Sequence, residues 1–67
     1  MDMLLTYLLD IINTDTMVVL RVDGKLVGGC NVYDFPSRHD LNQYYGNKVI
    51  EVKAIDKMKI EVDLEEK

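Results

Sequence analysis

Two segments in the last third of the chain alternate apolar and charged residues, and this alternation constrains the fold more than any other feature. Residues 48–54 read KVIEVKA, and residues 58–64 read MKIEVDL. Neighbouring side chains of a β-strand point to opposite faces of a sheet, so each segment has one apolar and one charged face. The pattern predicts two strands whose apolar face is covered and whose charged face meets water.

The connection between these two strands can be three or five residues long. A three-residue connection pairs Val52 with Ile60 and places Glu51 opposite Glu61. A five-residue connection pairs Lys53 with Glu61 instead. Like charges directly opposite each other are unfavourable in a sheet, so the charge pattern favours the longer connection.

The first half of the chain predicts a helix followed by a β-hairpin. Residues 2–13 have the leucine and isoleucine stripe of an amphipathic helix, and residues 16–22 are rich in β-branched residues typical of a strand. Asp23-Gly24 is typical of a two-residue hairpin turn, with residues 25–33 as the return strand. This turn places Leu20 opposite Val27, unless a bulge at Gly28-Gly29 resets the register. The other face then carries Met17, Val19, Arg21, Leu26, Gly28 and Cys30.

A short polar helix is expected at about residues 37–45, with Ser37 as its N-cap, before the two last strands. The element order is then α-β-β-α-β-β. We predict an α+β fold in which the N-terminal helix packs on a four-stranded, mainly antiparallel sheet. Residues 1–64 are expected to form a single domain and residues 65–67 a frayed acidic tail.

Composition and charge restrict the partners and the location of the protein. The 67 residues carry a net charge of −4, which does not attract nucleic-acid phosphates or anionic membranes. The single cysteine cannot form an internal disulfide, and no zinc-binding spacing is present. The first residues lack the basic segment of a signal peptide and fall short of the roughly 20 apolar residues of a membrane span. We expect a cytoplasmic protein with no cofactor, no bound metal and no direct contact with nucleic acid or membrane.

The sequence contains no recognisable catalytic constellation. His39, the single histidine, is interpreted as a surface residue, and Cys30, beside two glycines in a strand, as a small apolar core residue. The glycines do not have the spacing of a phosphate-binding loop. A domain of this size seldom encloses the pocket of about 300 Å³ or more that a reaction site needs. We therefore expect that the protein is not an enzyme.

The segment of residues 33–45 is the first candidate for binding another protein. It concentrates tyrosine and arginine, which are enriched in protein-binding hot spots because they bury large areas and also form hydrogen bonds. Phe35 and Tyr44 are assigned to closing the core. The candidate partner-binding residues are Tyr33, Asp34, Arg38, His39 and Tyr45.

Self-association as a homodimer is expected because a domain this small has a limited core of its own. Exposed apolar patches mark interfaces, and the candidate residues on the outer face of the first hairpin are Met17, Val19 and Leu26. An open sheet edge is a second route to a dimer. A different register that buries these three residues under the second helix is the alternative to a patch.

The order of motifs along the whole chain suggests a class of proteins. An L-x-x-L-L helix lies within Leu4 to Ile12, a strand and a Gly-containing turn follow at Met17 to Gly24, and a strand ends in Tyr33-Asp34. A polar helix at Ser37 to Tyr45 then precedes paired strands from Lys48 to Leu64. In these features the chain resembles short acidic accessory proteins encoded by phages and prophages of low-GC Gram-positive bacteria. The resemblance implies an accessory role in a mobile element, where some such proteins inhibit bacterial immunity by binding, and it carries no catalytic residues.

The leading hypothesis from the sequence is a non-enzymatic protein-protein interaction module that inhibits a host or immune-defence protein by binding. One alternative is an oligomer that sequesters a nucleotide or metabolite in a pocket built between subunits. The other is a nucleic-acid mimic that uses the acidic residues 61–67, which carry a net charge of −3.

Overall fold

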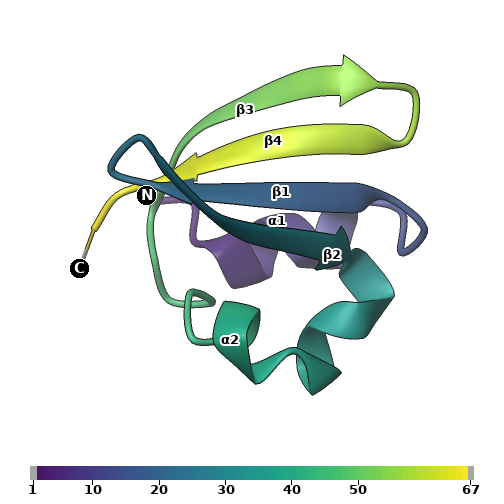
Figure 1. Ribbon diagram of the computed structural model, residues 1–67, viewed down its shortest axis with the longest axis horizontal. Coiled ribbons are helices and arrows are strands. Elements are labelled where there is room, and N and C mark those ends of the chain that lie inside the picture. Colours follow the sequence, from purple (N-terminus) through teal and green to yellow (C-terminus); the bar gives the residue numbers. More distant parts are fainter. Residues whose placement is uncertain (1, 67) are drawn as a thin grey trace.

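The computed structural model describes residues 2–66 and has one helix, a four-stranded sheet and a helical connection. The elements are α1 (Leu5–Ile11), β1 (Met17–Val22), β2 (Lys25–Asn31), the 3₁₀ helix η1 (Val32–Ser37), α2 (His39–Asn42), β3 (Val49–Asp56) and β4 (Lys59–Leu64). This confirms the α+β class (Figure 1). Met1 and Lys67, at the ends of the predicted domain and tail, lie outside the described residues.

The sheet is mixed, with strand order β2-β1-β4-β3, so the prediction of a mainly antiparallel sheet needs correction. The two hairpins are antiparallel, but β1 and β4 run parallel in the centre, with Val18 opposite Ile60 and Leu20 opposite Val62. Figure 1 shows β3 and β2 at opposite edges of the sheet. The two hairpins are therefore joined side by side through their more buried strands.

The first hairpin has the predicted turn but a different register. Asp23 and Gly24 have positive φ values of 53° and 79°, as the turn requires. Arg21 pairs with Leu26, whereas Leu20 pairs with Gly28. The register therefore shifts by one residue between Leu20 and Arg21. The prediction that Leu20 faces Val27 is therefore wrong, because Val27 is the extra residue of a bulge. The bulge moves Gly28 and Cys30 from the predicted outer face to the inner face, where Cys30 pairs with Val18 and is buried.

The second hairpin confirms the predicted pairing of Lys53 with Glu61. The connection is nevertheless shorter than the five residues expected. Asp56 pairs with Lys59, and the register shift falls between Ala54 and Asp56. A bulge at Ile55 therefore combines the favourable charge pairing with a tight two-residue turn.

The core lies between α1 and the inner face of the sheet and extends below η1 and α2. Leu20, Phe35, Leu41, Val62 and Leu64 are almost inaccessible to solvent. The full set of buried apolar residues is Leu5, Leu8, Leu9, Val18, Leu20, Cys30, Val32, Phe35, Leu41, Val62 and Leu64. Phe35 thus closes the core as the sequence predicted.

Helix α1 is shorter than the predicted residues 2–13. At its N-terminal end Leu4 forms an antiparallel bridge with Lys48, and the Val49 N–H donates to the Met3 carbonyl at 2.7 Å. At its C-terminal end Ile12 is extended, with φ −103° and ψ 161°. Residues 2–4 therefore extend along the start of β3 instead of adding a turn to the helix.

The predicted helix at residues 37–45 is divided between η1, α2 and turns. Ser37 is not the N-cap of α2, because it lies in η1 and its Oγ donates to the Asp34 carbonyl at 2.9 Å. Arg38 takes the N-cap position without a side-chain capping bond. Pro36 fixes its own φ, which is compatible with a short helical turn but leaves no N–H for a continuous helix.

Strand β3 is exposed from Ile50 to Asp56, which corrects the expectation of a covered apolar face on this strand. Val52 is 45 % exposed and Ile50 is 62 % exposed. Figure 1 shows α1 behind β1 and β2, with β3 standing clear of it. One helix of two turns is too narrow to cover four strands spaced about 4.8 Å apart, so β3 remains outside the core.

Candidate partner-binding surface

A half-open groove lies between α1 and η1. Its volume is about 450 Å³. The lining residues are Thr6, Leu9, Asp10, Ile12, Thr14, Val32, Tyr33, Phe35, Pro36 and Tyr45. The sequence predicts that a domain of this size seldom encloses a pocket for a reaction site, and this groove is open on one side.

Backbone hydrogen bonds fix the wall of the groove that η1 provides. The Val32 N–H donates to the Thr16 carbonyl at 3.0 Å, and the Tyr33 N–H donates to the Thr14 carbonyl at 3.2 Å. Val32 and Phe35 are buried below η1 and anchor it to the core. From the other side, Asn42 Nδ2 donates to the Phe35 carbonyl at 3.2 Å. This wall is held at both ends and presents Tyr33 at a defined position.

The other wall comes from one flank of α1. Residues four apart on a helix lie on the same flank, so Thr6 and Asp10 both face η1 while Leu5 and Leu8 face the core. Asp10 supplies the lining with a carboxylate, and Thr6 and Thr14 supply hydroxyl groups. The groove therefore has an apolar floor, a hydroxyl-rich rim and a negative charge on one side.

Tyr45 connects the groove to the core. Its ring packs against Phe35 with centroids 6.2 Å apart and planes inclined at 32°. Burial, together with the nearby Cys30 and Asp10, raises the pKa of the Tyr45 hydroxyl. This hydroxyl stays protonated at neutral pH and can both donate and accept a hydrogen bond at the rim.

The predicted partner-binding residues fall into two groups. Tyr33, which is 58 % exposed, and Tyr45 both line the groove. Asp34 is half-buried in η1, while Arg38 and His39 lie at the start of α2 and are not part of the lining. The structure thus brings together two of the five.

Six lining residues outside the predicted segment were missed: Thr6, Leu9, Asp10, Ile12, Thr14 and Val32. The signal in the sequence is the pair of polar residues Thr6 and Asp10, four apart within an otherwise apolar helix. Such a polar flank can face water or a neighbouring element. Whether this flank of α1 faces η1 depends on the path that the chain takes over the helix after β2.

The predicted self-association residues lie on the outer face of the sheet beside charged side chains. Met17 and Val19 are half-buried, and Leu26 is 66 % exposed. Arg21 on β1 places its Nη1 3.8 Å from Glu61 Oε2 and its Nε 3.7 Å from Asp63 Oδ1. The apolar side chains are therefore interrupted by an ion-pair cluster on this face.

The two side chains with the best potential for reaction chemistry differ in burial. Cys30 is buried on the inner face, and that burial raises the pKa of its thiol, which disfavours the nucleophilic thiolate. His39 is exposed on α2, and neither residue lines the groove. Within residues 2–66, no group of three or more His, Cys, Asp or Glu side chains is arranged to hold a metal ion.

Comparison with known proteins gives the chain no relative. No protein-family model, no curated protein and no solved structure matches it. In the described part of the chain, no helix combines the length and the apolar character needed to cross a membrane.

Proposed function

We propose that this protein is a non-enzymatic binding module that inhibits a host or immune-defence protein by holding one of its segments in the groove between α1 and η1. The groove itself carries the proposal. The groove has a volume of about 450 Å³, which accepts one or two side chains of a partner. Its tyrosine and threonine hydroxyls provide directional hydrogen bonds. An accessory role in a phage or prophage is the setting that the sequence resemblance implies.

The chemistry of the lining favours one type of partner segment. The floor, with Leu9, Val32 and Phe35, suits an aliphatic or aromatic anchor side chain. Asp10 suits a lysine or arginine next to that anchor, because opposite charges attract strongly in a partly desolvated groove. Asp34, Arg38 and His39 extend the proposed surface beyond the lining, since Asp34 follows Tyr33 and the other two lie two and three residues after Pro36.

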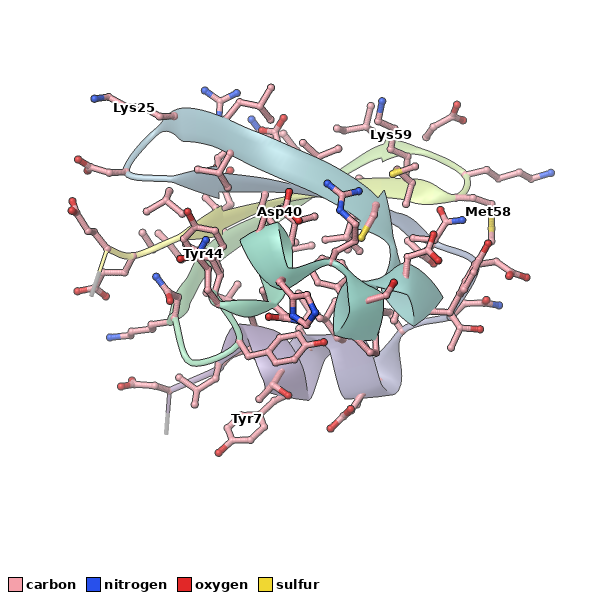
Figure 2. All side chains as sticks on the ribbon, turned by 60° about the horizontal axis from the view of Figure 1, so that its bottom comes forward. Tyr7, Lys25, Asp40, Tyr44, Met58 and Lys59 are labelled. Atoms are coloured by element: carbon pink, nitrogen blue, oxygen red, sulfur yellow. The ribbon has the colours of Figure 1, made fainter. Side chains whose placement is uncertain are left out.

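Site-specific photocrosslinking in host cell extract tests this proposal. A photoreactive phenylalanine analogue at Tyr33 is expected to capture one protein, and the same analogue at Lys25 is not. Lys25 and Tyr33 are separated by the length of β2, about 20 Å at roughly 3.3 Å per residue. Figure 2 shows Lys25 at the end of the sheet remote from Met58.

The variants separate binding from folding. Y33A/R38A is expected to reduce affinity for the captured protein by at least about tenfold, because both side chains are of the hot-spot type. The matched control K25A keeps full affinity. Y45F removes one hydroxyl without disturbing the ring packing on Phe35 and should weaken binding less. Wild-type affinity in Y33A/R38A, with an unchanged melting temperature, contradicts the proposal.

A small-ligand function is the second candidate, because the volume of the groove lies within the range of about 300–1,000 Å³ of small-molecule sites. Native mass spectrometry of protein purified from its host distinguishes the two, since a retained nucleotide or metabolite favours sequestration. Nucleic-acid mimicry has less support. Arg21 lies within 4 Å of both Glu61 and Asp63 and partly neutralises the acidic face that a mimic would use.

A further inference from the structure

Strand β3 has an open edge whose limits are defined by its neighbours. It is the last strand of the order β2-β1-β4-β3. At its start, the Leu5 N–H donates to the Asn47 carbonyl at 3.0 Å and the Val49 N–H donates to the Met3 carbonyl, so residues 3–5 cover this part of the edge. At its other end, the bulge at Ile55 bends the strand. A second register shift lies between Val49 and Glu51, so residues 51–54 are the regular part of the edge that remains accessible to another strand.

The backbone of Val52 points toward this open edge. On β4, the Leu64 carbonyl accepts a hydrogen bond from the Asp23 N–H at 3.3 Å, so Leu64 faces β1. Backbone groups alternate along a strand, so Val62 also faces β1 and makes no ladder bond to Val52, the residue opposite it. The N–H and C=O of Val52 are therefore free to pair with a further strand.

The side chains around Val52 make the edge complementary to itself. In an antiparallel pairing of two copies with Val52 opposite Val52, Glu51 of each copy lies opposite Lys53 of the other. Shifting the register by two residues in either direction places Lys53 opposite Lys53 or Glu51 opposite Glu51. Like charges directly opposite are unfavourable, so one register is selected among the three.

We propose that two copies of the chain form a symmetric dimer by antiparallel pairing of their β3 edges, with the two-fold axis at Val52. The two copies of Val52 exchange both backbone hydrogen bonds. The flanking Glu51–Lys53 pairs occupy non-hydrogen-bonded positions, where opposite side chains approach most closely. The pairing also covers part of Val52 and Ile50, which are exposed in the single chain.

The dimer is independent of the groove. The groove is formed by η1, which follows β2, and β2 lies at the opposite edge of the sheet from β3. The two-fold axis runs perpendicular to the joined sheet, so both copies of α1 lie on the same face of eight continuous strands. Loss of dimer formation can therefore be measured without loss of groove binding.

Charge exchange at two positions tests the pairing and its register. E51K alone or K53E alone places like charges opposite each other twice per dimer. Each variant is expected to weaken dimerisation by about tenfold or more in sedimentation equilibrium. The double variant E51K/K53E restores complementary pairs and should dimerise like the wild type. A mixture of the two single variants is expected to form heterodimers, because one copy then offers two lysines and the other two glutamates.

The fold provides an internal control. Within one chain Glu51 lies opposite Asp63, and its Oε1 lies 3.9 Å from Lys53 Nζ. E51K therefore exchanges one exposed ion pair for another and is expected to leave the melting temperature nearly unchanged. A wild type that stays monomeric up to millimolar concentration overturns the proposal. A dimer that persists in E51K overturns the proposal as well. The interface would then lie on another surface, such as that of Met17, Val19 and Leu26. If K53E fails to fold, E51K alone decides between these outcomes.

Discussion

The guanidinium of Arg38 holds the carboxylate of Asp40 through two parallel hydrogen bonds, from Nε to Oδ1 at 3.0 Å and from Nη2 to Oδ2 at 2.9 Å. These bonds lower the pKa of Asp40 and raise that of Arg38. We predict that R38A raises the pKa of Asp40 toward its ordinary value. A carbon-detected NMR titration of the aspartate carboxyl groups measures this shift.

The pH dependence of this pair has a defined sign. The pKa of Asp40 is lower in the folded than in the unfolded state, so the pair stabilises the fold at neutral pH and loses its effect as pH falls through the folded pKa, below about pH 4. Because both side chains are exposed, the effect on the melting temperature is expected to be small. An Asp40 titration that is identical in wild type and R38A contradicts the geometry.

Leu20 and Leu26 offer a matched pair for testing the core. Leu20 is fully buried in the central strand β1, whereas Leu26 lies near the hairpin tip and is 66 % exposed. L20A is predicted to lower the free energy of unfolding by about 2–5 kcal/mol, because it removes apolar contacts and leaves a cavity. L26A is expected to change it by less than about 0.5 kcal/mol. Urea denaturation compares the two, and equal losses would mean that β1 is not central.

Gly29 is predicted to be intolerant of any side chain. A Cβ at this position would lie 2.7 Å from the Val18 carbonyl oxygen and 3.0 Å from the Val19 Cα, and both atoms belong to the backbone of β1. G29A must therefore push the two strands apart, with an expected loss of about 1–3 kcal/mol. Thermal unfolding followed by circular dichroism checks this prediction. Wild-type stability in G29A would argue against the bulged register of the hairpin.

Cys30 should make the stability of the fold sensitive to alkali in a measurable way. Burial raises the pKa of its thiol above that of the unfolded chain, so stability falls as pH rises beyond the unfolded value of about 8.5. In C30A this part of the decline in stability disappears. The further decline in stability at higher pH remains, because the pKa of Tyr45 is also raised in the folded state. Labelling with a thiol reagent at pH 8 is expected to be at least about tenfold slower in the native protein than in urea. Equal labelling rates would place the thiol at the surface.

The local pattern predicts each strand but not the way in which the hairpins join. Opposite charges at Lys53 and Glu61 favour the observed β3–β4 pairing over a three-residue connection, which would place Glu51 opposite Glu61, although the observed pairing also sets Glu51 opposite Asp63. The parallel contact between β1 and β4 leaves no such mark, because all of its inner residues are apolar and fit either direction.

A bulge was anticipated at Gly28-Gly29, but its position at Val27 and the groove escaped prediction for a common reason. Both depend on contacts between distant segments, whereas periodicity reports on neighbours in sequence. The aromatic residues at Tyr33 and Tyr45 indicate a surface, and the structure places both on one groove. The α1 wall of that groove, with Thr6 and Asp10, is defined by the crossing of η1 over the helix flank, which the sequence pattern does not encode.

The central place of β4 has a consequence for how the protein is made. β4 is the last element of the described chain to leave the ribosome, yet it fills the gap between β1 and β3 and contributes the buried Val62 and Leu64. The nascent chain therefore exposes the edge of β1 and much of its apolar interior until β4 has been synthesised. A chain that ends before β4 would keep this apolar surface exposed. Chaperones would retain it and proteases would degrade it, so only chains that include β4 would accumulate.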